Sequence, residues 1–566
     1  MPSRIIMHRP PLLTMNQAPL MNGSIKTKDP YAIGLYRYLL QFPDYPETWL
    51  GSFELSCLLF RDPMKEKPAA LILDAINREK EQAFPGDFFQ QLHIARAALA
   101  VAEYSADRSI LKRLSDWCNW TEINWDQIIC QSRLRIAPAD YMEFLVRFYQ
   151  MTGLKAILRL CTRLRSSAMD WTSVLHAYGK HKNQEKTAET FFEEKFLNNE
   201  LDENDFETRQ RIIAHAEILA DGMRYTALSA LFSGNGQELT AGQTGWQIIR
   251  KNNYSICGGT SGTPFLSGTG SDQYISLTTL SAWADSFAAQ LVLADSKWAL
   301  DEMIRIMMNG FSFAVYNNPI QIQQAVNCPD YHAIQPVNQN VSNQEIHAIS
   351  RAAHTLSLFY RYAVTLGKTQ IRINYLLPGQ YILHRGKIRL LIQEDNLQVK
   401  RMDDSDLRFL FYCAATETRK IQISINGKEY SCNQTDQSVI SIAEGRYYSF
   451  EEKIQTDSVI WFTEQPCLIE ENTHHHGKCW FFSNYLLAVP ADPDNWKLAA
   501  TASPMVENGR SIFGLFTYIT NWKEKDGLPE DLPILPKAGN EIKKIEMKPY
   551  FQNTNRISMF PRTADL

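Results

Sequence analysis

The chain of 566 residues lacks any apolar run of about 18 residues, so no membrane-spanning helix and no membrane partner are expected. Its first twenty residues break every apolar stretch with proline, asparagine or histidine, unlike the unbroken apolar region of a secretory signal peptide. The lack of such a region favours the cytoplasm. A leader missing from the N-terminus would instead indicate the periplasm or the cell exterior.

An excess of one charge is also lacking, because 58 Lys and Arg stand against 62 Asp and Glu, for a net charge of −4. Without a basic surplus, no nucleic-acid partner is expected. The ten cysteines are scattered along the chain and form no C-x-x-C pair. The sequence therefore predicts no disulfide scaffold, and mostly buried thiols.

Length and a hydrophobic content of 45% predict two or three domains. Residues 1–30 are rich in proline and methionine and predict an irregular leader. Through residues 31–368 apolar residues recur at helical spacing, as in Phe88, Leu92 and Ala95. This second region is predicted to be an all-helical domain.

The apolar period changes from helical to two in the C-terminal region, residues 369–566. Ile421, Ile423 and Ile425 alternate with polar residues, and Asn426-Gly427 then supplies the two-residue turn favoured in hairpins. Many short strands separated by turns are typical of a β-sandwich. The sequence therefore predicts an α domain followed by a β-sandwich domain with a C-terminal strand.

Several motifs follow one another in the order found in a known family. They are His215-Ala216, Cys257-Gly258-Gly259-Thr260, the helical segment from Ser276 to Met308-Asn309-Gly310, Asn374-Tyr375-Leu376-Leu377-Pro378, Lys548-Pro549-Tyr550 and Arg556-Ile557-Ser558-Met559-Phe560-Pro561. Through them the sequence resembles glycoside hydrolase family 127, the β-L-arabinofuranosidase family. The resemblance implies an N-terminal (α/α)6 barrel followed by a β-sandwich, with a carbohydrate ligand in the barrel cleft.

In that family three cysteines and one glutamate hold a zinc ion, and one of the cysteines is the nucleophile. Thiolates suit zinc, and the metal keeps a thiol ionised at neutral pH. In this chain Ser276 stands at the glutamate position and Thr278 at the first cysteine, while Val341 and Ser342 stand at the adjacent cysteine pair. The resemblance therefore implies that the zinc and thiolate chemistry is lost, and neither a metal nor another cofactor is expected.

The family's general acid is a glutamate in the loop before the Ser276 helix, and this loop here contains no glutamate. Its one acid is Asp272. Glu217, Asp221 and Asp285 are the other acids nearest the inferred pocket, although a solvated helix face explains Asp221 and Asp285 equally well. Because two carboxylates on opposite sides of a sugar suffice for ordinary glycoside hydrolysis, Asp272 and Glu217 are the candidate catalytic residues.

Further side chains of the inferred pocket are candidates for binding the sugar. His215 aligns with a position that lines the family's substrate pocket, although a histidine at a helix start can also cap its own helix. The predicted substrate-binding set is His215, Ser276, Thr278, Ser342 and His347.

Several other residue clusters could bind a ligand or react, but each has a simpler structural explanation. His474-His475-His476 favours a polar loop or strand end over a metal site, because adjacent strand residues point to opposite faces. Cys328, Asp330 and His332 have a spacing that is common by chance. Cys257 could act as a nucleophile beside a basic neighbour, but a buried inert thiol is the preferred interpretation. The glycine-rich run from 262 to 271 lacks the lysine of a phosphate-binding loop and indicates a pocket rim.

Two classes of function remain open. The first is a glycoside-hydrolase-like protein that binds a glycan in the barrel cleft, either without catalysis or as a glycosidase that uses a carboxylate pair. The second is a scaffold or partner-binding protein with the same fold, because function belongs to the site and not to the fold. The glycan, its linkage and the oligomeric state are not specified by the sequence.

Overall fold

The structure is a computed structural model of the chain. It describes residues 18–20, 24–77, 84–178, 202, 206–269, 273–294, 297–316, 323–325, 342–366, 370–383 and 388–392, and beyond these the strands named below together with residues 504 and 552.

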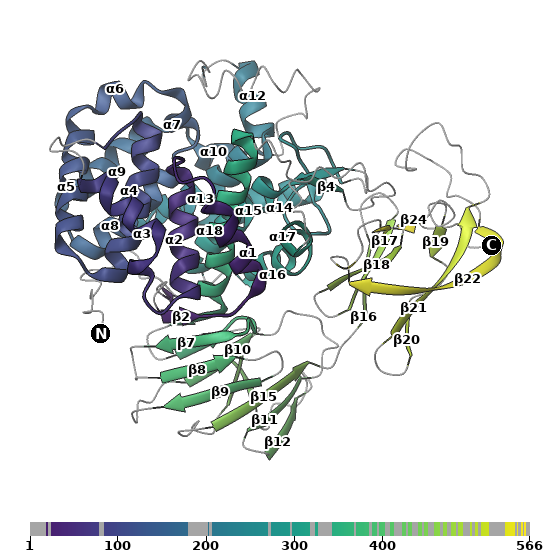
Figure 1. Cartoon of the computed structure of the whole chain (residues 1–566). Helices are drawn as coiled ribbons and strands as arrows, with labels where there is room; N and C mark the ends of the chain where they lie inside the picture. The colour runs from purple at the N-terminus through teal and green to yellow at the C-terminus, as the bar shows by residue number, and fades with distance from the viewer. Residues whose placement is uncertain are drawn as a thin grey trace.

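The first part of the chain is helical, as the apolar spacing predicts (Figure 1). Its helices are α1 (Pro30–Leu39), α2 (Glu47–Leu59), α3 (Lys67–Asn77), α4 (Phe88–Ser105), α5 (Arg108–Ile123), α6 (Trp125–Ile129), α7 (Ser132–Ile136), α8 (Ala139–Thr152), α9 (Lys155–Ser167), α10 (Trp171–His176), α12 (Phe206–Ala214), α13 (Ala216–Ser233), α14 (Gly236–Asn253), α15 (Leu277–Ala294), α16 (Lys297–Arg305), the π-helical turn η4 (Ile306–Phe311), α17 (Ser312–Tyr316) and α18 (Asn343–Ala363). None of the described helices is both long and apolar enough to cross a membrane.

Local sequence explains where these helices begin and end. Asp87 caps α4, since its side chain accepts the backbone N–H of Gln90 while the Gln90 side chain accepts the N–H of Asp87. This reciprocal pair satisfies two of the backbone donors that a helix start leaves open. Gly153 ends α8 with a φ of 68°, a left-handed conformation that glycine adopts without strain.

Six of the helices form a closed ring in which each packs against the next, in the order α2, α4, α8, α13, α15 and α18, with α18 returning to α2. Ion pairs fix the direction of neighbouring helices. Glu47 and then Glu54 of α2 meet His347 and then His354 of α18, so both helices run the same way. The starts of these helices therefore lie at one end of the ring.

The strands form three large sheets and one two-stranded sheet of β3 (Tyr274–Ser276) and β4 (Gln323–Ala325). The six-stranded sheet has the order β1 (Ala18–Pro19), β5 (Val364–Leu366), β6 (Gln370–Ile373), β10 (Arg408–Tyr412), β14 (Tyr447–Phe450) and β13 (Ile440–Ala443). The seven-stranded sheet has the order β12 (Lys428–Cys432), β11 (Ile421–Ile425), β15 (Ser458–Glu464), β9 (Asn396–Arg401), β8 (Ile388–Ile392), β7 (Gly379–Leu383) and β2 (Ile25–Lys26).

The third sheet has nine strands and follows the other two along the chain (Figure 1). It contains β16 (Leu468–Asn472), β17 (Gly477–Phe482), β18 (Tyr485–Pro490), β22 (Ala538–Pro549), β21 (Ser511–Ile519) and β19 (Leu498–Ala500), with β20 (Met505–Glu507), β23 (Arg556–Ile557) and β24 (Phe560–Pro561) paired to its strands. The strand-rich region predicted over residues 369–566 is thus present, but it is divided among several sheets.

Two details bear on the predicted boundaries. The described part of residues 1–30, predicted as an irregular leader, contains the strands β1 and β2, which pair with β5 and β7. The change from helix to strand falls between Ala363 and Val364, close to the predicted end of the helical region.

The hairpin expected at residues 426–427 is confirmed by the pairing of Ile425 with Lys428 across these two residues.

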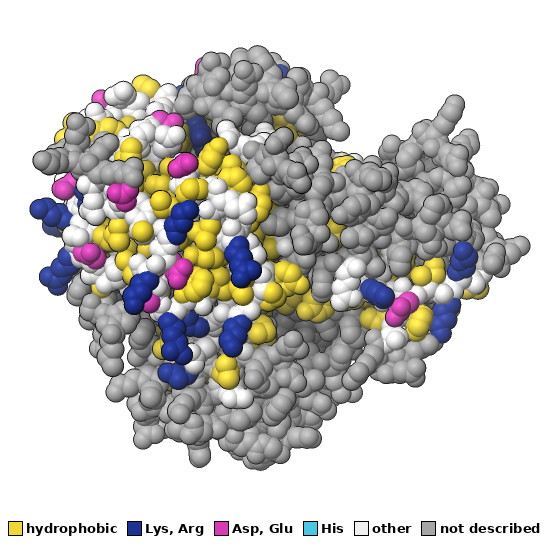
Figure 2. Space-filling view, in the orientation of Figure 1, with side chains coloured by type: hydrophobic (Ala, Val, Ile, Leu, Met, Phe, Trp, Pro, Cys, Tyr) yellow, Lys and Arg dark blue, Asp and Glu magenta, His cyan; other side chains and the backbone are white. Residues whose placement is uncertain are grey.

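Basic, acidic and apolar side chains are interspersed on the face of the helical part seen in Figure 2. This mixture agrees with the near balance of acids and bases in the whole sequence. Toward the lower part of this face Lys and Arg side chains predominate (Figure 2).

Candidate functional site

The predicted site residues gather at helix starts. His215 precedes α13, and Glu217 is the second residue of that helix. Ser276 ends β3 directly before α15, Thr278 is the second residue of α15, and Ser342 directly precedes α18. The two predicted residues Asp272 and Val341 lie outside the described part of the chain. The same holds for residues 326–341, with the Cys328 group, and for the histidines at 474–476.

His215 caps its helix, which is the simpler of its two interpretations. Its Nδ1 accepts the backbone N–H of Ile218 at 3.3 Å, and its ring meets the edge of Phe265 with 5.5 Å between ring centres. The carbonyl of Pro264 accepts the N–H of Ala216 at 2.9 Å. The loop that contains the glycine-rich run is therefore bound to the start of α13.

Ser276 and Thr278, which stand where the family resemblance implies metal ligands, form hydrogen bonds at the start of α15. Ser276 Oγ lies 2.8 Å from both Thr278 Oγ1 and Thr279 Oγ1, and it accepts the backbone N–H of Thr279 at 3.0 Å. These groups cap their own helix and offer no thiolate. Among the described residues, no group of three or more His, Cys, Asp and Glu is arranged to hold a metal ion. The absence of zinc stays a prediction.

Ser342 forms a capping box at the start of α18. Its Oγ accepts the N–H of Glu345 at 3.2 Å, and the Glu345 carboxylate accepts the N–H of Ser342 at 2.6 Å. The sequence predicts Ser342 as a substrate-binding residue, and the structure gives it this local role.

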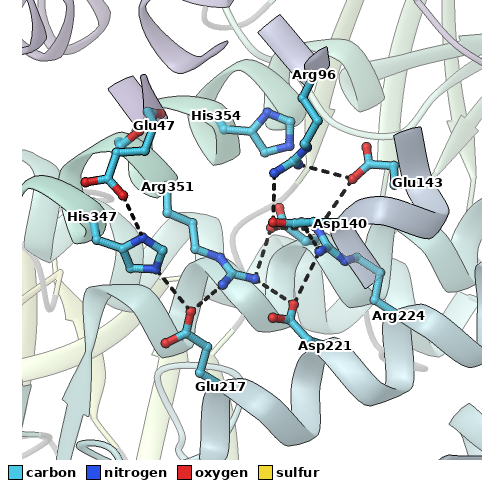
Figure 3. Close-up of polar contacts among 12 residues, drawn as sticks. Glu47, Arg96, Asp140, Glu143, Glu217, Asp221, Arg224, His347, Arg351 and His354 are labelled. Atoms are coloured by element: carbon cyan, nitrogen blue, oxygen red, sulfur yellow. Dashed lines mark hydrogen bonds and ion pairs between the residues drawn. The ribbon is translucent and has the colours of Figure 1, made fainter. Parts of the chain in front are cut away.

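His347 lies between two carboxylates that come from different helices (Figure 3). Its Nδ1 is 3.5 Å from Glu47 of α2, and its Nε2 is 3.4 Å from Glu217 of α13. Burial opposes the charged imidazolium, but Glu217 and Glu47 outweigh it and raise the pKa of His347 to about 9. This histidine is therefore a cation at neutral pH.

Arg351, one turn further along α18, connects three acids. Its guanidinium bonds to Glu217 and lies 2.8 Å from Asp221 (Figure 3). It also approaches Asp285 of α15 at 3.5 Å. Burial works against ionisation of Glu217, but Arg351 and His347 hold the pKa of its carboxyl far below the usual range. Glu217 is thus a carboxylate at neutral pH and a poor proton donor.

A second group of ion pairs adjoins the first and joins α4, α8 and α13. Arg96 lies 2.8 Å from Asp140, and Arg224 bonds to the same carboxylate (Figure 3). Arg224 also approaches Glu143 at 3.5 Å. Burial is again outweighed, since Arg96 and Arg224 hold the pKa of Asp140 well below its ordinary value and that of Glu143 at about 2.

Asp285 is the exception among these acids. Burial raises its pKa despite the nearby His354, Arg351 and Arg224, because its side chain is only 3% exposed and both arginines remain 3.5 Å away. Its Oδ1 has no hydrogen-bond partner. A raised pKa is a feature of a general acid, but a side chain that is only 3% exposed is not open to a ligand in solvent.

The charged groups continue deeper into the ring. Glu54 of α2 is fully buried and lies 2.6 Å from His354 of α18, while Arg147 of α8 lies 2.6 Å from Glu103 of α4. Burial disfavours the charged imidazole, but Glu54 raises the pKa of His354. The interior of the ring is therefore held together by ion pairs between helices.

Cys257 is fully buried, in agreement with the preferred interpretation of an inert thiol. Most of the charged interior was not predicted from the sequence. A signal was nevertheless present, because Glu217, Asp221 and Arg224 follow one another at the four- and three-residue spacing of one face of α13. His347 and Arg351 have the same spacing on α18.

Comparison with known proteins gives a fold. No family model matches the sequence, and no curated protein matches it. Solved structures share its architecture over nearly the whole chain. A protein described as a glycoside hydrolase has a TM-score of 0.68 at 11% identity and covers 97% of this chain and 98% of its own. A family 127 β-arabinofuranosidase gives 0.63 at 13% identity, with coverage of 97% and 98%. A family 127 β-L-arabinofuranosidase from Geobacillus stearothermophilus T6 gives 0.60 at 13% identity and 94% of each chain.

The chain therefore has the fold of the family 127 β-L-arabinofuranosidases. The resemblance inferred from short motifs is confirmed at the level of the fold.

Proposed function

We propose that this protein is a glycoside-hydrolase-like carbohydrate-binding protein whose ligand lies where the ring helices start. In this proposal the ring is the inner layer of an (α/α)6 barrel, and the strands after it include a β-sandwich. One observation carries the proposal: four charged side chains at this end of the ring remain partly exposed. They are His347 at 38%, Asp140 at 36%, and Glu47 and Glu217 at 22% each.

Such a cluster suits a sugar for a chemical reason. Ionised carboxylates accept hydrogen bonds from hydroxyl groups, and bonds to charged groups are stronger than neutral ones. Arg351 holds Glu217 and Arg96 holds Asp140, while His347 lies beside Glu47. The acceptors are therefore ionised and oriented before a ligand arrives. The fold shared with glycoside hydrolases supports a carbohydrate over other polar ligands.

The described acids favour binding over hydrolysis. A glycosidase needs one carboxyl that keeps its proton and a second carboxylate on the other side of the sugar. Glu217 suits only the second role, because Arg351 and His347 hold the pKa of its carboxyl far below the usual range. Asp285 has the raised pKa of an acid but is buried beside Arg224 and Arg351. Ser276, Thr278 and Ser342 supply no nucleophilic thiol.

Titration calorimetry or ligand-observed NMR with L-arabinose and methyl β-L-arabinofuranoside tests the binding. We expect Glu47→Gln and Glu217→Gln to weaken binding about 10-fold or more, since a hydrogen bond to a charged group contributes roughly 1.5–3 kcal/mol. Glu122→Gln is the matched control, because Glu122 forms its ion pair with the exposed Arg159 on α5 and α9. If no neutral sugar binds, or if all three variants bind equally, the scaffold interpretation replaces this one.

A second assay separates binding from catalysis. We expect no release of arabinose from a β-L-arabinofuranoside, and no stoichiometric zinc by elemental analysis. Release that disappears in Glu217→Gln would instead support a carboxylate mechanism. Release that disappears in Cys257→Ala would assign the reaction to a relocated thiol.

A further inference from the structure

The π-helical turn η4 lies where the nine-stranded sheet meets the helical part, since it packs against β18. π-helical turns are rare and often accompany functional sites. Asn309 closes this one, because its Nδ2 donates to the carbonyl of Arg305 at 3.0 Å. The side chain is fully buried.

The other end of the same amide reaches the sheet. Asn309 Oδ1 accepts the backbone N–H of Leu486 in β18 at 2.7 Å, and Leu486 is also fully buried. A buried amide or backbone N–H without a partner is costly. One side chain therefore satisfies both the turn and a strand that lies far along the chain.

Packing strengthens this contact. The guanidinium of Arg305 lies over the ring of Phe481 in β17 at 4.4 Å and over that of Tyr254 at 5.8 Å. Cys479, Phe481 and Leu486 belong to the same apolar core as the helices. The third sheet and the helical part thus share one core at this point.

The turn also holds the loop that follows α14. Gly310 donates its N–H to the carbonyl of Cys257 at 3.3 Å. Gly258 has a φ of 99°, and a Cβ there would lie 2.7 Å from the backbone nitrogen of Ile306. Only glycine therefore permits this close approach of the loop to the turn.

The loop continues from this contact to the start of α15. Thr260 Oγ1 accepts the Nε1–H of Trp283 at 2.9 Å, and the carbonyl of Gly262 accepts the N–H of Ser276 at 3.3 Å. Hydrogen bonds thus lead from β18 through Asn309 and Gly310 to the loop and then to the rim of the proposed sugar site.

We propose that Asn309 is a positioning residue, which places the loop from Cys257 to Gly262 and thereby makes the C-terminal sheet part of the sugar site. Two of the motifs that carry the family resemblance lie at this contact, namely Cys257-Gly258-Gly259-Thr260 and Met308-Asn309-Gly310. In this proposal they connect the sheet to the loop and do not take part in a reaction. Only the effect on sugar affinity rests on the proposed function. The effect on the loop does not.

Hydrogen exchange on the whole chain tests whether Asn309 connects β18 to the loop. In Asn309→Ala we expect the amides of residues 257–262 and of Leu486 to exchange at least 10-fold faster, and sugar affinity to fall. Leu487→Ala is the matched control, because Leu487 is a fully buried neighbour on β18 that makes no bond to Asn309. It should loosen the strand and leave the loop protected.

Asn309→Asp keeps an acceptor for Leu486 and removes the donor to Arg305, and it also serves if Asn309→Ala does not fold. We expect faster exchange in the loop and a protected Leu486 amide. A loop that stays protected in the Asn309 variants while β18 loosens would overturn the proposal. If the wild type binds no sugar, the proposed function fails, and the exchange result still decides the role of Asn309.

Discussion

The helix starts at Ser276 and Ser342 and the charged interior of the ring satisfy polar side chains in different ways. At the two starts each hydroxyl bonds within its own helix, to Thr279 or to Glu345. In the interior each charged group bonds to other helices, and Arg351 of α18 reaches both α13 and α15. The positions where the family resemblance implies metal ligands are thus locally satisfied, whereas the charges hold the ring together.

This difference has an energetic consequence. A capping hydroxyl contributes roughly 1 kcal/mol to its own helix. A buried charge that loses its partner costs several times more, because the remaining ion stays out of water. Loss of a capping hydroxyl at these positions is therefore expected to cost little, and loss of an ionised partner in the interior is expected to cost much more.

The largest effect is expected for Arg351→Ala. Glu217, Asp221 and Asp285 would lose a shared cation inside the ring, so we expect the free energy of unfolding in urea to fall by about 3–5 kcal/mol. Arg159→Ala, which breaks an exposed pair, should cost less than about 1 kcal/mol. Equal losses in both variants would contradict the contrast between interior and surface.

A smaller effect is expected from His347 as the pH rises. Its pKa is about 9 in the folded protein and 6.5 when unperturbed, so its stabilisation is complete below pH 6.5 and is lost as the pH rises through 9. Because the His347 side chain is 38% exposed, solvent screening limits this loss of stability to about 1 kcal/mol.

Urea unfolding of wild type and His347→Gln at pH 6 and pH 9.5 measures this loss. The difference between the two proteins should shrink at the higher pH, and the buried His354, which titrates in both, cancels in the comparison. A difference that grows with pH would show that His347 is not held as a cation.

Ser342→Ala and Ser276→Ala are expected to lower the free energy of unfolding by about 1 kcal/mol each, through loss of a helix cap. Sugar affinity should stay the same in both. If binding weakens while thermal stability does not change, these hydroxyls contact the ligand directly, as the sequence predicts.

The smallest effect is expected for Asp285→Asn. Burial already opposes the charge of this acid, so removing it should leave the free energy of unfolding within about 0.5 kcal/mol of the wild type at pH 7. Urea unfolding provides the measurement. A loss as large as that of Arg351→Ala would mean that Asp285 carries a structural charge like its neighbours.

Much of the fold could be predicted from the sequence because its signals are local. Apolar spacing of 3.6 and of 2 separates the helices from the strands, and Ser342 with Glu345 has the spacing of a capping box. Pairings such as Ile25 with Tyr381 leave no such signal, because the strand is two residues long and its partner lies far along the chain.

The site was predicted less completely for a similar reason. His215, Glu217 and His347 lie within or beside motifs, which is why the sequence predicts them as site residues. Glu47 and Asp140 have no motif around them, and they meet the site only because the ring closes. Spacing on one helix can show which residues share a face, but not which other helices that face will meet.

During synthesis the strands β1 and β2 are made long before the strands with which they pair. Their partners, β5 and β7, are made about 350 residues later, which at roughly 5–20 residues per second takes some 20 to 70 seconds. Until then β1 and β2 lack these partners, although α1 and α2 follow directly behind them in the chain. Two strands that are made before α1 are thus among the last to find their partners, and a nascent chain stalled before residue 364 would lack both partner strands.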